Sequence, residues 1–110
     1  MKKSAAVKLL LATGMILAFS GVVQATGNAE AAKDKVSMCM GCHGIEGYRT
    51  GYPFVYHVPK LGGQHEAYLV KALKDYRSGE RDHVNMTAIA ATLSDQDIAD
   101  LAAYYAGAGN

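Results

Sequence analysis

Residues 37–47 read "SMCMGCHGIEG" and contain both cysteines of this 110-residue chain. Cys39 and Cys42 are separated by two residues, and His43 follows directly. This is the spacing of covalent haem attachment, in which two thiols form thioethers along one edge of the porphyrin. The histidine that follows then provides an axial nitrogen to the iron. The motif predicts one haem c, bound through Cys39 and Cys42 and ligated by His43.

Three other uses of paired cysteines fit this stretch less well. A thioredoxin-like site needs a strand before the motif and a helix that begins at it, whereas here a helical pattern precedes the cysteines. A zinc site would need further ligands from His57, His65 and His83, whose spacings match no common zinc finger. A disulfide across two residues would stabilise the chain little, because the loop it closes is very short.

The first 25 residues have the pattern of a secretory signal peptide. The basic n-region contains Lys2, Lys3 and Lys8, the apolar run reads "LLLATGMILAFSGVV", and Val23-Gln24-Ala25 is a small-residue cleavage site. We expect cleavage after Ala25, export to the periplasm and a mature domain at 26–110; an uncleaved anchor is the alternative. Export agrees with haem attachment, because bacteria attach c-type haem on the far side of the cytoplasmic membrane.

The mature domain would carry eight basic and ten acidic residues, a formal charge of −2. Such a balance argues against nucleic acid as a partner, since phosphate binding needs a basic face. A domain of about 85 residues often needs a cofactor or a cross-link for stability. A buried porphyrin would supply the missing apolar surface.

Apolar spacing predicts an all-α domain with three main helices and long loops around the haem. The first helix is expected from about Asn28, its N-cap, to the cysteines, with Gly44 as the stop. The second covers 63–79, and the third follows a capping box formed by Ser94 and Asp97. Their apolar stripes are Leu69, Ala72, Leu73 and Tyr76, and Ile98, Leu101, Ala102 and Tyr105. No strand is predicted in the Gly- and Tyr-rich segment 44–63.

Met86 is the expected second iron ligand. Met38 and Met40 flank Cys39 on the proximal side and are expected to serve in packing. Met86 lies in the segment "RDHVNMTAIAATL", expected as a loop that closes over the distal face. The alternatives are Met86 as core filler and His83 as the ligand. The choice matters because a thioether raises the reduction potential and a second histidine lowers it.

The chain resembles the bacterial class I cytochromes c, in particular the small cytochromes c-553 and one half of the dihaem cytochromes c4. Three segments in the same order carry the resemblance: "CMGCHG", "VPKLGGQHEAYLVKALKDYRSGER" and "NMTAIAATLSDQDIADLAAYYAG". It implies that the carbonyl of Pro59 accepts a hydrogen bond from Nδ1 of His43, which orients the ring. It also implies that the first and last helices cross, with contacts at Ala102 and Tyr105.

The insert 48–57 departs from the short polar loop expected of this group. It contains Tyr48, Tyr52, Phe54, Tyr56 and His57. We expect these aromatic side chains to wall the haem edge or to bond a propionate, with Arg49 as a possible ion-pair partner. A docking surface for a partner enzyme is the alternative.

The resemblance implies a monomeric, periplasmic one-electron carrier that meets its redox partners transiently and is not an enzyme. Membranes would be met only through membrane-bound partners. Five basic residues could line the exposed haem edge: Lys60, Lys71, Lys74, Arg77 and Arg81. Two alternatives stay open: a dedicated cytochrome subunit of a periplasmic oxidoreductase, and a haem sensor or enzyme with open iron.

Overall fold

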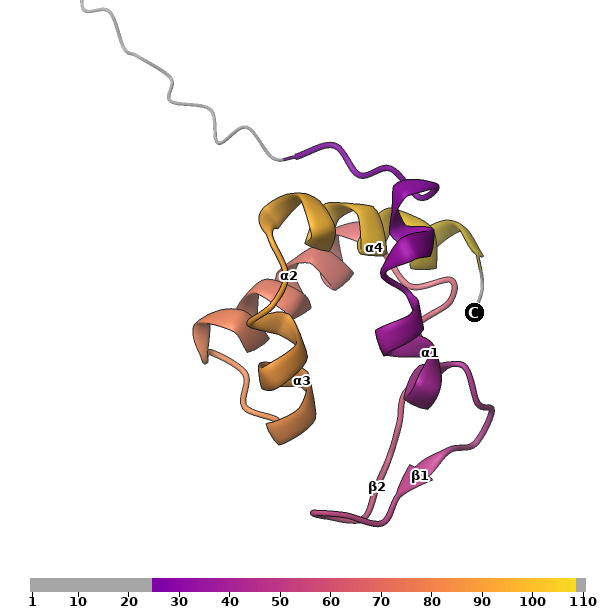
Figure 1. The fold of residues 1–110 in the computed structure, drawn as a ribbon, viewed down its shortest axis with the longest axis vertical. Coiled ribbons are helices and arrows are strands. Elements are labelled where there is room, and N and C mark those ends of the chain that lie inside the picture. The colour runs from indigo at the N-terminus through magenta and orange to yellow at the C-terminus, as the bar shows by residue number, and fades with distance from the viewer. Residues whose placement is uncertain (1–24, 109–110) are drawn as a thin grey trace, which may run out of the picture.

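The computed structural model describes residues 25–108, which form a small helical domain (Figure 1). Its elements are a 3₁₀-helix η1 (Ala31–Asp34), α1 (Ser37–His43), β1 (Arg49–Thr50), β2 (Tyr56–His57), α2 (Glu66–Ser78), α3 (Val84–Ala90) and α4 (Asp95–Ala108). The predominance of helix confirms the predicted all-α class. Within the described range, no helix has the length and apolar character needed to cross a bilayer. The predicted signal peptide falls almost wholly outside that range and stays a prediction.

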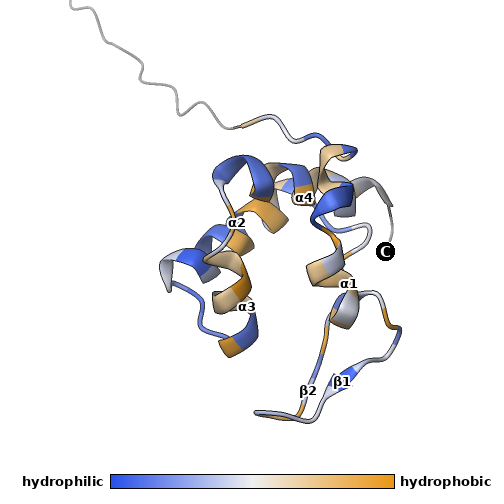
Figure 2. Cartoon of the chain, in the orientation of Figure 1, coloured by the Kyte–Doolittle hydropathy of each residue, from blue (hydrophilic) through white to orange (hydrophobic). Residues whose placement is uncertain are grey.

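The core lies where α4 packs against α2 and η1. Ile98 and Leu101 of α4 are 0% and 2% exposed, and Ala32 of η1 is fully buried. Ala102 and Tyr105 join the same cluster, as the resemblance implied for the crossing of the first and last helices. Figure 2 shows hydrophobic positions on α2 and α4 among the polar ones, as expected of helices that bury one face.

The predicted start of α4 and the predicted end of α2 are both present. Ser94 and Asp97 form the reciprocal capping box: the Ser94 N–H donates to Asp97 Oδ2 at 2.9 Å, and the Asp97 N–H donates to Ser94 Oγ at 3.1 Å. Gly79 follows α2 with φ of 88°, the left-handed conformation that a glycine adopts without cost. α2 itself begins at Glu66, three residues later than predicted.

The first predicted helix is not continuous. The N-cap of η1 is Glu30 and not Asn28 as predicted, although Asn28 Oδ1 accepts from the N–H of Glu30 at 3.0 Å in the turn that precedes the helix. The chain then winds as the 3₁₀-helix η1, turns at Lys35 and starts α1 at Ser37. Gly44 is the C-cap of α1, as predicted. A prediction from residue propensities does not separate 3₁₀ from α winding, because the choice depends on how η1 packs against α4.

The segment 44–63 contains a short antiparallel hairpin that the prediction missed. Arg49 pairs with His57 and Thr50 with Tyr56, and Thr50 Oγ1 donates to the carbonyl of Phe54 at 2.9 Å. Strands of two residues are too short to show an alternating pattern. The prediction of a loop around Met86 was also wrong, because Met86 lies in the first turn of α3.

Candidate haem site

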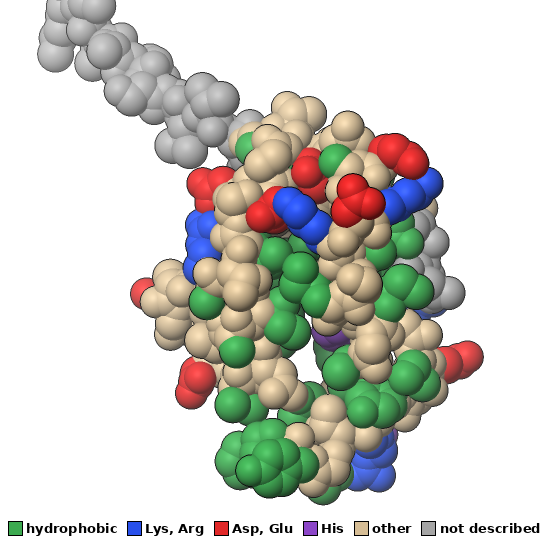
Figure 3. All heavy atoms as spheres, in the orientation of Figure 1, with side chains coloured by type: hydrophobic (Ala, Val, Ile, Leu, Met, Phe, Trp, Pro, Cys, Tyr) green, Lys and Arg blue, Asp and Glu red, His purple; other side chains and the backbone are tan. Residues whose placement is uncertain are grey.

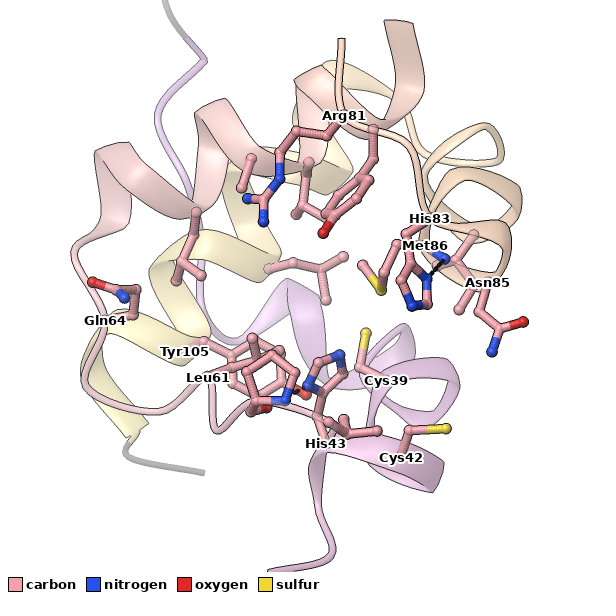
Figure 4. A pocket seen from close by; sticks show the side chains of 18 of the residues that line it. Cys39, Cys42, His43, Leu61, Gln64, Arg81, His83, Asn85, Met86 and Tyr105 are labelled. Carbon is pink, nitrogen blue, oxygen red and sulfur yellow. Dashed lines mark hydrogen bonds between the residues drawn. The ribbon is translucent and has the colours of Figure 1, made fainter. Parts of the chain in front are cut away.

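A cavity of about 750 Å³ opens at the centre of the domain, between α1, the hairpin, α2, α3 and α4. All five predicted site residues line it: Cys39, Cys42, His43, Pro59 and Met86. Figure 3 shows the hollow among hydrophobic side chains, and Figure 4 shows His43 and Met86 projecting into it from different elements. The apolar stripe of α2 lines the same cavity through Leu69, Ala72, Leu73 and Tyr76.

His43 stands at the end of α1 with its ring held by the backbone of another segment. Its Nδ1 lies 2.7 Å from the carbonyl oxygen of Pro59, so Nδ1 carries the proton and donates it. The other ring nitrogen, Nε2, is then the basic one and is available to a metal. A carbonyl partner at Nδ1 also fixes the ring orientation and makes the ring a stronger donor.

Cys39 and Cys42 are both half-buried on α1. Burial raises the pKa of the Cys39 thiol, although the nearby Tyr105 hydroxyl opposes this shift. A redox-active thiol needs the opposite shift, so the environment argues against a thioredoxin-like site. Within residues 25–108, His, Cys, Asp and Glu side chains nowhere gather in threes at a spacing that would hold a metal ion. The zinc alternative therefore has no ligand set in this part of the chain.

Met86 and His83 both line the cavity, and a hydrogen bond links them. His83 is the N-cap of α3, and its Nδ1 accepts the N–H of Met86 at 3.3 Å. The backbone N–H of His83 in turn donates to Thr87 Oγ1 at 3.3 Å. His83 thus orders the helical turn that carries Met86. The sequence pattern predicted a loop here and did not predict this capping role.

The other two methionines differ from each other. Met38 lines the cavity and is 41% exposed, whereas Met40 does not line it and is 49% exposed. The expected packing role therefore does not hold for Met40 within the protein. Neither residue lies on the α3 side of the cavity, in agreement with their exclusion as distal ligands.

Two arginines that were predicted near the haem edge have different positions. Arg49 is exposed and does not line the cavity, whereas Arg81 does. The Arg81 guanidinium lies over the ring of Tyr76, 4.6 Å from its centroid, and donates to the Tyr68 hydroxyl at 3.4 Å. Arg81 was one of the five basic residues predicted at the haem edge, and it lies at the cavity.

The predicted basic edge is reduced to two residues. Lys60 and Arg81 line the cavity. Lys71 pairs with Asp75 at 2.6 Å, and Arg77 pairs with Asp95 at 2.5 Å and donates to the carbonyl of Leu93. These pairs lie along α2 and its contact with the start of α4, so they stabilise the helix surface.

The residues present fit a haem. The volume is within the roughly 300–1,000 Å³ usual for cofactor and ligand sites, and the walls are predominantly apolar side chains. The hydroxyl of Tyr105 is buried at the cavity without a hydrogen-bond partner in the described residues, and burial raises its pKa. Two thiols on one wall, a free imidazole nitrogen and a thioether are the donor set that covalent haem attachment and axial ligation require.

Comparison with known proteins identifies the family. The cytochrome c family model matches residues 29–107, so the chain belongs to the cytochrome c family. Cytochrome c4 of Pseudomonas aeruginosa is 41% identical over 99 residues, covering 90% of this chain and 47% of the relative. Cytochrome c-554(548) of Halomonas halodenitrificans is 46% identical over 82 residues, covering 72% and 94%.

Solved structures agree with this assignment. A cytochrome c4 structure from Acidithiobacillus ferrooxidans superposes with a TM-score of 0.53 and 38% identity, covering 66% of this chain and 42% of the other. The chain spans about half the length of the cytochrome c4 relatives that it matches. The predicted resemblance to one half of cytochrome c4 is confirmed, and that to cytochrome c-553 is supported by the homologue from Helicobacter pylori. Membership of the family confirms covalently bound haem c as the cofactor, consistent with the Cys39–Cys42–His43 motif.

Proposed function

We propose that this protein carries single electrons between redox proteins in the periplasm, with its haem iron held by His43 and Met86. The observation that carries the proposal is the convergence of four donors on one apolar cavity: Cys39, Cys42, His43 and Met86. These residues lie up to 47 positions apart in sequence, from Cys39 to Met86, so their meeting is a property of the fold.

The roles of these residues follow from their surroundings. Haem c supplies a reversible one-electron couple at iron. Cys39 and Cys42 retain the haem covalently. His43 offers Nε2 to the iron, because its Nδ1–H donates a hydrogen bond to the carbonyl oxygen of Pro59. Met86 provides a thioether from the opposing segment, which favours the reduced state and a raised potential. Apolar walls from α2 and α4 exclude water and favour the less charged oxidation state.

The proposal includes cleavage after Ala25 and a mature cytochrome c domain at 26–110. Expression with a periplasmic haem-maturation system, followed by mass spectrometry, measures both the mature N-terminus and the addition of one haem. Retention of residues 1–25 in the haem-loaded protein would contradict the proposed cleavage. Haem that is removed by acidified organic solvent would contradict covalent attachment.

The ligand assignment is tested by visible and near-infrared spectroscopy of the purified haem protein. Methionine ligation gives ferric haem a weak near-infrared charge-transfer band, which we expect to disappear in Met86→Ala. Met38→Ala is the matched control, because Met38 also lines the cavity but lies on α1. Persistence of the band in Met86→Ala would rule out Met86, and a bis-histidine spectrum in the wild type would point to His83.

A second candidate is a dedicated cytochrome subunit of a periplasmic oxidoreductase. The favouring observation is the end of the hairpin, where Tyr52, Phe54 and Val55 are 87%, 70% and 64% exposed. Figure 3 shows hydrophobic side chains gathered at that end of the molecule. Size-exclusion chromatography of the native complex separates the two candidates, because a free carrier elutes alone and a subunit elutes with its enzyme.

Open iron, as in a sensor or haem enzyme, is the third candidate. The ferrous protein is mixed with carbon monoxide at neutral pH. A carrier with both axial positions occupied keeps its spectrum, whereas an open site binds the gas at once.

A further inference from the structure

We propose that Tyr56 is a positioning residue for Met86: it fastens the aromatic hairpin to the first turn of α3 and thereby holds the methionine thioether over the cavity. This inference rests on the proposed axial role of Met86. It assigns a function to the aromatic insert, which the haem motif, the family match and the capping of α3 do not explain.

The direct link is a hydrogen bond across 29 positions of sequence. Asn85 Nδ2 donates to the Tyr56 hydroxyl at 2.7 Å, in a partly buried setting. Asn85 is the residue next to Met86 in α3. A short bond to that neighbour restrains the backbone of the turn from which the Met86 side chain projects.

A second contact acts on the residue that caps the same turn. The rings of Tyr56 and His83 meet edge to face, with centroids 4.4 Å apart and planes at 89°. His83 also lies near Tyr76 of α2, at 6.5 Å between ring centroids. His83 Nδ1 accepts the Met86 N–H. The contacts with Tyr56 and Tyr76 therefore restrain the His83 ring, and this ring restrains the backbone at Met86.

The hairpin has few other ties to the helices. Its strands pair with one another, and Thr50 bonds within the hairpin to Phe54. Its far end is exposed. Tyr56 is therefore the point where the insert acts on the distal side of the cavity, and Figure 4 shows Asn85, Met86 and His83 grouped there.

The test uses the haem-loaded protein and measures how often Met86 leaves the iron. Imidazole added to the ferric protein binds only where the methionine has detached, so its apparent affinity reports the detached population. We expect Tyr56→Phe, which removes only the hydroxyl, to raise that affinity about fivefold, the effect of one lost neutral hydrogen bond. Asn85→Ala should have a similar effect, and the double variant should add little to either single variant, because both remove the same bond.

Tyr68→Phe is the matched control. Tyr68 also lines the cavity and also accepts a hydrogen bond, from Arg81, but it lies on α2 and has no hydrogen bond to the Met86 turn within residues 25–108. We expect its imidazole affinity to equal that of the wild type. If Tyr56→Phe and Asn85→Ala bind imidazole with the affinity of the wild type, and the wild type shows the near-infrared methionine band, the positioning role of Tyr56 is overturned. Absence of that band in the wild type would instead overturn Met86 ligation itself.

Discussion

Two walls of the cavity are built differently. We call α2 and α4 the helical wall, and residues 49–57 the hairpin wall. Behind the helical wall lies a protein core in which Ile98 and Leu101 are 0% and 2% exposed. The hairpin wall has exposed apolar side chains, with Phe54 at 70%, and reaches the helices mainly through Tyr56. The helical wall is stabilised by a buried protein core, whereas most apolar side chains of the hairpin wall are exposed.

The largest expected difference between the walls is in stability. Ile98→Ala should lower the free energy of unfolding of the haem protein by about 2–5 kcal/mol, because it removes fully buried methylene groups and leaves a void. Val55→Ala on the hairpin wall is the matched apolar truncation, and its 64% exposed side chain should change stability by no more than about 0.5 kcal/mol. Denaturant unfolding measures both. Equal losses would remove the distinction between the walls.

A close approach behind the helical wall predicts the next effect. A Cβ on Gly27 would lie 2.2 Å from the carbonyl oxygen of Ala99 and 2.9 Å from the Cβ of Ala103, both on α4. Gly27→Ala should therefore cost about 1–3 kcal/mol, since the backbone must shift. Gly107→Ala is the control, because a Cβ on this glycine of α4 would face open space, and it should not destabilise. Thermal unfolding of both variants measures the difference, and an unchanged Gly27→Ala would show that the N-terminal segment does not pack there in solution.

The capping box at the start of α4 should contribute less. Ser94→Ala removes the oxygen that accepts the Asp97 N–H, at a cost of about 1 kcal/mol. Ser37→Ala, at an exposed position at the start of α1, is the control and should be nearly silent. Urea titration resolves the two. A larger effect from Ser37 than from Ser94 would contradict the assigned cap.

The smallest expected effect is a pH dependence at the junction of α4 and the N-terminal segment. The hydrogen bond from the Asn28 N–H to Asp100 at 2.7 Å, together with one from Gln96, lowers the pKa of the Asp100 carboxyl. Its stabilising contribution is present above the unfolded pKa of about 3.9 and is lost as pH falls through the lower folded value. Asp100→Asn should therefore unfold with a weaker acid dependence below about pH 4.

Exposed Asp34 provides the comparison for that pH series. Asp34→Asn should leave the acid dependence of unfolding unchanged. Melting temperatures recorded from pH 7 to 3 give both slopes. Parallel curves for Asp100→Asn and the wild type would mean that the carboxylate does not hold the N-terminal segment.

Sequence patterns predicted the parts that depend on local or regularly spaced residues. The α4 capping box, the Gly79 end of α2 and both apolar stripes needed only neighbours three or four positions apart, and all are present. The hairpin, the break between η1 and α1 and the helix α3 were missed. Each of these is short, so its conformation follows from contacts with distant segments more than from its own residues.

The candidate site divides in the same way. The cysteines, His43, Pro59 and Met86 are carried by motifs, and the family match confirms the class of protein and its haem. Arg49 does not line the cavity, whereas Arg81 and Tyr56, both predicted at the haem edge, do. Asn85 and its hydrogen bond to Tyr56 became evident only from the tertiary structure.

The residues proposed to bind the haem could be predicted from the chain because covalent attachment demands particular side chains at fixed spacing. Which face of each helix is buried could be read for the same reason, since helical periodicity is local. Three contacts could be found only in the tertiary structure: the hydrogen bond between the hairpin and α3, the capping of the Met86 turn by His83, and the ion pair of α2 with Asp95. Those contacts join residues 3 to 29 positions apart whose identities alone are compatible with many partners, and only the packing of the chain around one cavity selects among them.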